Sequence, residues 1–136
     1  MSTATAGARK TILLVDDQHF FVAVQQSILE RQGYRVLTAA DGPEGLAKAR
    51  EHEPDLILLD VHMPGMDGFT VCEKLKQDNI LKKIPVIILT STQDAKVNDK
   101  AFRAGAEVTV LKSISAERFL NILRVVLSRG KSSAGL

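Results

Sequence analysis

The chain has 136 residues, the length of one domain and enough for a self-sufficient hydrophobic core. Its formal net charge is only +2 and its Lys and Arg residues are scattered, so the sequence indicates neither nucleic acid nor a membrane surface as a partner. The single cysteine, Cys72, excludes an internal disulfide and a cysteine-based zinc site, and no apolar run has the length of a membrane span, so we expect a cytoplasmic protein.

Residues 1–9 and 130–136 are small and polar and are predicted to form loose tails around one domain, residues 10–129. Within it, the run Ile12–Val15 is apolar throughout, as strands buried on both faces require. Apolar residues then recur at helical spacing over 21–29, before Gly33. The run Tyr34–Ala39 has the mixed polarity of an edge strand, and residues 42–52 carry a proline near the start of a predicted helix.

The rest of the domain repeats this alternation. The runs Leu56–Leu59 and Val86–Leu89 are again fully apolar, and Glu107–Leu111 is a second candidate edge strand. Three helices are predicted from apolar residues at helical spacing: residues 69–75 with Cys72 in the core, residues 97–104 before Gly105, and residues 119–127.

Strand and helix thus alternate five times, which predicts an α/β fold with a parallel sheet between two layers of helices. The crossovers are expected to be right-handed, and five strands are too few for a barrel of the eight-stranded type. We therefore expect a flavodoxin-like, doubly wound (βα)5 sandwich with the strand order 2-1-3-4-5.

Reactive side chains stand where four of these strands end. Asp16 and Asp17 follow the first strand, Asp60 the third, Thr90 the fourth and Lys112 the fifth. The binding crevice of an open α/β sheet lies beyond the carboxyl ends of its strands. The five side chains are therefore predicted to line one crevice.

Three carboxylates in one crevice repel one another, by roughly 4 kcal/mol per pair at 4 Å and an effective dielectric near 20. Lys112 supplies one compensating charge, and a divalent cation is expected to supply the rest. Oxygen ligands of this kind suit Mg²⁺. A metal, an ammonium and the Thr90 hydroxyl would together receive a phosphoryl group, and Asp60 is the expected nucleophile because it ends the central strand.

The same residues resemble a known family, the receiver domains of two-component response regulators. "ILLVDDQ" is similar to the family's first strand and acidic pair, and "DLILLDVHMPGMDGFTV" to its phosphorylation segment. "IPVIILTS" resembles the strand with its switch hydroxyl, and "AFRAGAEVTVLKS" its last helix, strand and lysine. The resemblance covers about residues 10–129.

This resemblance implies that Asp60 accepts a phosphoryl group from a histidine kinase or a histidine phosphotransfer protein. It implies that Asp60, Asp17 and the backbone carbonyl of His62 hold Mg²⁺, while Asp16 acts largely through water. The signal would pass to a downstream effector protein or output domain by protein contact. The identity of these partners, phosphorylation-dependent dimerisation, and whether the domain stands alone or belongs to a longer protein stay open.

The resemblance further implies that Thr90 moves to meet the phosphoryl group and that Lys112 pairs with it. Two positions depart from the family pattern. Ser113 follows the lysine where proline is usual, and Thr109 stands where the family has a switch aromatic. A cis bond before a residue other than proline costs about 2.5–4 kcal/mol, so we expect the Lys112–Ser113 bond to be trans. The departures concern the output mechanism and leave the phosphorylation residues intact.

Other interpretations fit parts of the pattern. A degenerate receiver would bind partners without phosphorylation. A phosphatase of the haloacid dehalogenase type would need an acid where this chain has His62, so a turnover enzyme is not expected. His19 and His62 lie near the acids and suggest a transition-metal site. A hydroxyl or an aspartate at a strand end also commonly caps the following helix, which would apply to Thr90 and to one of Asp16 and Asp17.

Overall fold

The computed structural model describes residues 9–92 and 94–131, so the predicted tails lie almost wholly outside the described residues. Strands and helices alternate as predicted, with most boundaries within about one residue of the apolar patterns. The elements are β1 Thr11–Val15, α1 His19–Arg31, β2 Arg35–Ala39, α2 Gly42–His52, β3 Leu56–Asp60, α3 Gly68–Lys76, the short 3₁₀ helix η2 Leu81–Lys83, β4 Val86–Thr90, α4 Ala95–Ala104, β5 Val108–Leu111 and α5 Ala116–Arg129. None of the helices in the described part of the chain combines the length and apolar character needed to cross a bilayer.

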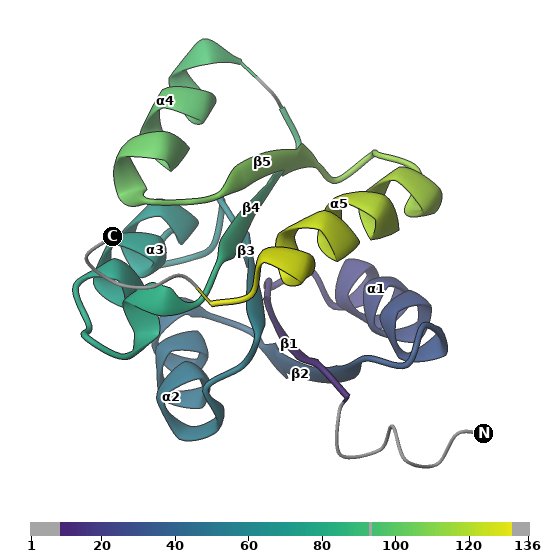
Figure 1. The fold of residues 1–136 in the computed structure, drawn as a ribbon. Coiled ribbons are helices and arrows are strands. Elements are labelled where there is room, and N and C mark those ends of the chain that lie inside the picture. Colours follow the sequence, from purple (N-terminus) through teal and green to yellow (C-terminus); the bar gives the residue numbers. More distant parts are fainter. Residues whose placement is uncertain (1–8, 93, 132–136) are drawn as a thin grey trace.

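The five strands form one parallel sheet in the order β2-β1-β3-β4-β5, which confirms the predicted flavodoxin-like topology (Figure 1). The two strands of mixed polarity, β2 and β5, are its edges. Val15 is in register with Leu59, and Asp60 with Leu89. The carboxyl ends of the central strands therefore reach the same level, where the functional side chains were expected.

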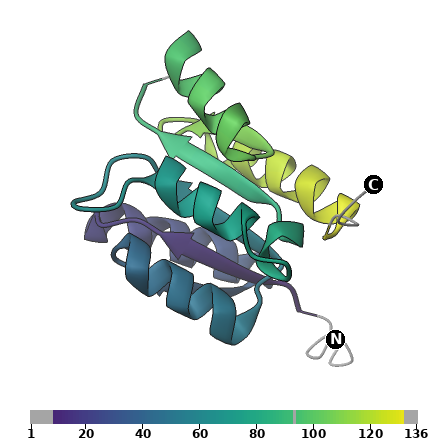
Figure 2. The same cartoon turned by 90° about the vertical axis from the view of Figure 1, so that its left-hand side faces the viewer.

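Helices cover both faces of the sheet (Figure 2). On one face, alternate strand residues such as Leu13, Ile57 and Ile88 belong to a core completed by α2, α3 and α4. On the other face, residues such as Leu14 and Leu58 lie beneath α1 and α5. Every residue of β3 and β4 is buried, which explains the unbroken apolar runs Leu56–Leu59 and Val86–Leu89 within them.

The helix starts decide the capping alternatives. Four helices have an N-cap side chain that accepts a hydrogen bond from a backbone N–H of the first turn: Asp41, Asp67, Asp94 and Ser115. The N-cap of α1 is Gln18, whose side chain makes no such bond. The N-caps of α1 and α4 are Gln18 and Asp94, so the capping interpretation of Asp16, Asp17 and Thr90 is wrong.

Candidate functional site

Three aspartates meet at the carboxyl ends of β1 and β3. Asp16 and Asp17 follow β1 directly, and Asp60 is the last residue of β3. One carboxylate oxygen of each lies within 4.8 Å of the other two. Asp16 and Asp60 are only 2% and 4% exposed, whereas Asp17 is half-buried, so the cluster opens to solvent on one side. The expectation that these side chains gather is confirmed.

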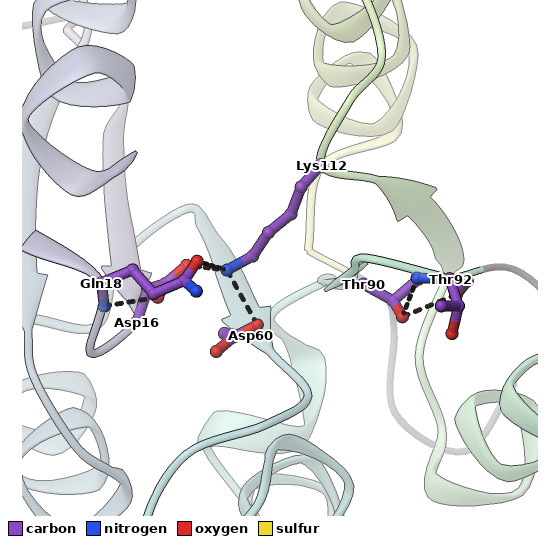
Figure 3. Close-up of polar contacts among 6 residues, drawn as sticks. All are labelled: Asp16, Gln18, Asp60, Thr90, Thr92 and Lys112. Carbon is purple, nitrogen blue, oxygen red and sulfur yellow. Dashed lines mark hydrogen bonds and ion pairs between the residues drawn. The ribbon is translucent and has the colours of Figure 1, made fainter. Parts of the chain in front are cut away.

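The Lys112 ammonium reaches the cluster from the end of β5 (Figure 3). Its Nζ lies 2.7 Å from Asp16 Oδ2 and 3.0 Å from Asp60 Oδ1, and it donates a hydrogen bond of 2.7 Å to Gln18 Oε1. The same nitrogen lies 4.5 Å from the centre of the Phe21 ring, a favourable position for a cation. One ammonium thus faces three carboxylates, and negative charge stays in excess.

The donor atoms fit a divalent cation. Asp16 Oδ2 is buried and forms an ion pair with the Lys112 ammonium 2.7 Å away. Buried carboxylates are costly unless positive charge compensates them, and one ammonium cannot compensate three carboxylates. An all-oxygen set with excess negative charge is what a hard divalent cation binds. The cluster can therefore hold a metal ion.

Burial raises the pKa of the Asp60 carboxyl above its ordinary value. Loss of contact with water is the main cause, the hydrogen bond from Lys112 opposes it, and the charges of Asp16 and Asp17 add to it. The ionised Asp60 is thus a poorly hydrated anion. A carboxylate that has lost part of its hydration shell is a stronger nucleophile than one in bulk water.

The raised pKa gives a testable dependence of stability on pH. The folded protein binds a proton at Asp60 over a pH range in which the unfolded chain has released it, so stability falls as pH rises through the folded pKa. In metal-free buffer at pH 7, Asp60→Asn should therefore raise the urea midpoint of unfolding. This gain should shrink as the pH is lowered through the folded pKa towards the unfolded value.

Glu44 provides a control of opposite sign. The backbone hydrogen bond from Ala40 and the side-chain bond with Lys48 lower its pKa, so its contribution to stability is present above the unfolded pKa and is lost as pH falls through the folded one. Glu44→Gln should lower the midpoint at pH 7. A gain for Asp60→Asn that stays constant with pH would contradict the assignment to Asp60 ionisation.

The Thr90 side chain is turned away from the acids. It is fully buried at the end of β4, where its Oγ1 donates to the Thr92 carbonyl at 2.6 Å and accepts from the Thr92 N–H at 3.2 Å. Figure 3 shows these bonds on the side of Thr90 away from Asp60. Thr90 lies at the carboxyl end of its strand, as predicted, but its side chain must rotate before it can reach a group on Asp60.

The segment after Asp60 is fixed by a close backbone approach. The Gly68 N–H donates to the Val61 carbonyl at 2.9 Å, and a Cβ at Gly68 would lie 2.2 Å from the Asp60 carbonyl oxygen. Only glycine lets α3 begin this close to the end of β3. From the sequence alone, Gly68 is predicted only as a turn residue. Its close approach to the Asp60 carbonyl depends on how α3 packs against the end of β3.

The histidines do not form a metal site of their own. His19 and His62 are both exposed. Among residues 9–92 and 94–131, the three aspartates are the only cluster of potential metal ligands, so nothing supports the transition-metal alternative. The peptide bonds of these residues include no cis bond, which confirms the trans Lys112–Ser113 bond expected from the loss of the proline.

Two residues beside Lys112 were missed by sequence reasoning. Gln18 and Phe21, both at the start of α1, contact its ammonium, although position 112 is far away in the chain. The one available signal was the amide side chain next to the acidic pair. The contact itself can be seen only in the folded structure, because it depends on the start of α1 lying close to the end of β5.

Together the fold and the site define a class of protein: a flavodoxin-like domain with a lysine beside an acidic cluster at the carboxyl ends of its strands. More specifically, the chain belongs to the response regulator receiver domain family, whose model matches residues 12–124. Receiver domains are phosphoacceptor modules of two-component signalling rather than turnover enzymes, and they interact with histidine kinases and downstream effectors. The phosphatase alternative is therefore not favoured.

Three relatives illustrate the similarity. The alkaline phosphatase synthesis transcriptional regulatory protein PhoP of Bacillus subtilis is 37% identical over 92% of this chain, which spans about half (51%) of PhoP. The polar-differentiation response regulator DivK of Brucella anthropi is 33% identical over 87% of this chain and 96% of DivK. The receiver domain of the sensor histidine kinase PA1611 from Pseudomonas aeruginosa, solved with magnesium in its active site cleft, has a TM-score of 0.82 and 26% identity, covering 88% of this chain and 98% of that one.

Proposed function

We propose that Asp60 takes up a phosphoryl group from a histidine kinase or a histidine phosphotransfer protein. The observation that carries this proposal is the meeting of three carboxylates within 4.8 Å beside the Lys112 ammonium. Asp60 is the acceptor because it is buried, has a raised pKa and contacts Lys112. An Asp60 oxygen attacks phosphorus, the bond from phosphorus to the donor imidazole nitrogen breaks, and that nitrogen keeps the electron pair.

Mg²⁺ is the proposed cation, held by Asp17, Asp60 and the His62 carbonyl, with Asp16 acting largely through water. When bound, it supplies positive charge to the transferring oxygens. The excess of three carboxylates over one ammonium and the magnesium in the related PA1611 receiver support this choice. Lys112 would exchange its contact with Asp60 for one with the phosphoryl group and compensate part of its charge.

The output is proposed to begin at Thr90. A phosphoryl group brings a charge of about −1.5 to −2 and three strong acceptor oxygens to Asp60. The Thr90 hydroxyl would rotate towards one of them and give up its two bonds to Thr92. The segment before α4 is thereby released, and the surface of α4, β5 and α5 is rearranged for an effector protein or output domain.

Beryllofluoride, a phosphoryl mimic, tests this proposal without any partner. With Mg²⁺ present, titration should shift the backbone amide NMR signals near Asp60 and Lys112, and those of Ser91 and Thr92 as Thr90 turns. Asp60→Asn should show none of these shifts. If the unmodified protein also shows none, the domain is a degenerate receiver and the proposal fails.

Metal binding gives a separate prediction. Asp17→Asn removes a proposed ligand without adding bulk and should raise the Mg²⁺ dissociation constant by about tenfold or more. Calorimetric titration with Mg²⁺ measures this directly. Asp41→Asn, at the exposed N-cap of α2, removes the same charge outside the cluster and should leave the constant nearly unchanged. An equal effect of both variants would mean that only the overall charge matters.

A further inference from the structure

The side chain of Gln18 is bound to the site rather than to its own helix. Gln18 is the N-cap of α1, a position where a short polar side chain normally bonds to the first turn, yet it makes no capping bond. Its Oε1 instead accepts a hydrogen bond of 2.7 Å from Lys112 Nζ. Figure 3 shows the two side chains directed towards one another.

Gln18 is also connected to the acidic cluster. Its backbone N–H donates to Asp16 Oδ1 at 2.9 Å, while the other oxygen of Asp16 forms the ion pair with Lys112. One turn along α1, the Phe21 ring lies 4.5 Å from the same ammonium. The start of α1 thus contacts the Lys112 ammonium through an acceptor oxygen and an aromatic face.

The three oxygen contacts of Lys112 have different fates in phosphoryl transfer. The contact with Asp60 Oδ1, at 3.0 Å, is given up when that carboxylate carries the phosphoryl group. Asp16 would share its charge between Lys112 and the proposed cation. The uncharged Gln18 takes part in neither change, so its oxygen can help to hold the flexible ammonium in place before and after transfer.

We propose that Gln18 is a positioning residue for Lys112: its amide oxygen holds the ammonium where it meets the phosphoryl group on Asp60. This inference rests on the proposed phosphorylation of Asp60 and adds a residue to it. This role requires an acceptor oxygen at the end of a side chain as long as glutamine, so that it reaches Lys112 Nζ. A side chain that is one methylene shorter would cap α1 but not reach Lys112.

This difference in reach separates positioning from helix stability. Gln18→Asn should cap α1 and hold or raise Tm, yet lower the rate of labelling by acetyl phosphate by about fivefold, the factor that corresponds to one lost hydrogen bond. Gln18→Met, of similar length but without the acceptor, should lose labelling to the same extent. Wild-type labelling by Gln18→Asn would overturn the proposal, because a residue that only stabilises α1 would tolerate asparagine.

A second readout does not depend on phosphorylation. Slow exchange should make the Lys112 ammonium signal visible in ¹⁵N-resolved NMR spectra of the unmodified protein. The signal should be lost in Gln18→Asn and Gln18→Met and kept in Gln18→Glu, which retains an acceptor of the same reach. An unchanged signal in Gln18→Met would refute the contact. If the wild-type protein takes up no phosphoryl group at all, the proposed function fails, and this signal still decides whether Gln18 holds Lys112.

Discussion

Asp60→Asn is expected to lower labelling by acetyl phosphate by at least about a thousandfold, to background. The amide has nearly the same shape as the carboxylate, so the packing at the end of β3 is preserved, but it is not a nucleophile and cannot form the acyl phosphate. The neighbouring Asp16 does not replace it, since Asp16 is committed to Lys112 and to the Gln18 N–H. Mass spectrometry of the intact protein would detect the added phosphoryl group.

Asp55 offers a matched control beside the same strand. It precedes β3 at the opposite end of the sheet, where its Oδ2 accepts a hydrogen bond from the Thr11 N–H at 2.8 Å. Asp55→Asn keeps an oxygen acceptor there and should label at the wild-type rate. Labelling of Asp60→Asn at that rate would remove Asp60 from its role and point to another acceptor, which peptide mapping would locate.

Gly68→Ala is expected to have the second largest effect, although Gly68 bears no reactive group. Its Cβ would lie 2.2 Å from the Asp60 carbonyl oxygen, a backbone atom that can move only with the end of β3. We expect a loss of about 1–3 kcal/mol in the free energy of unfolding. We also expect labelling to fall by about tenfold or more, because small displacements of reacting atoms are costly. Urea unfolding and acetyl phosphate labelling measure the two effects.

Gly45→Ala is the control for this change. Gly45 lies within α2, and its added Cβ would meet side-chain atoms of Val15 at 2.9 Å rather than backbone. Val15 is buried, so this contact also costs stability, but it leaves the backbone of β3 in place, and the higher helix propensity of alanine offsets part of the cost. Labelling should therefore stay near the wild-type rate. If both variants label equally well, the close approach at Gly68 does not position Asp60.

The sequence was sufficient for the fold and for the acidic cluster, and the reason is geometric. In a parallel sheet the carboxyl ends of all strands point to the same side of the molecule, so residues that directly follow neighbouring strands lie close together. Asp16 and Asp60 could be brought together in this way without coordinates, and so could Lys112. The edge positions of β2 and β5 followed from their mixed polarity.

Features that depend on the direction of a side chain could not be predicted. The sequence places Thr90 at the end of β4 but does not show that its hydroxyl bonds to Thr92. It gives Gln18 after the acidic pair but not its contact with Lys112. The approach of Gly68 to the Asp60 carbonyl depends on a distance between two elements, which no residue pattern encodes.

The bonding of Thr90 has a consequence for the resting domain. The Thr90 hydroxyl can bond either to Thr92 or to a phosphoryl group on Asp60, so the two arrangements exclude one another. Thr92, the partner that is abandoned, is exposed, and water can replace both lost bonds at little cost. The energy gap between the arrangements is therefore expected to be small, so the unmodified domain should already sample the signalling arrangement as a minor population that phosphate selects.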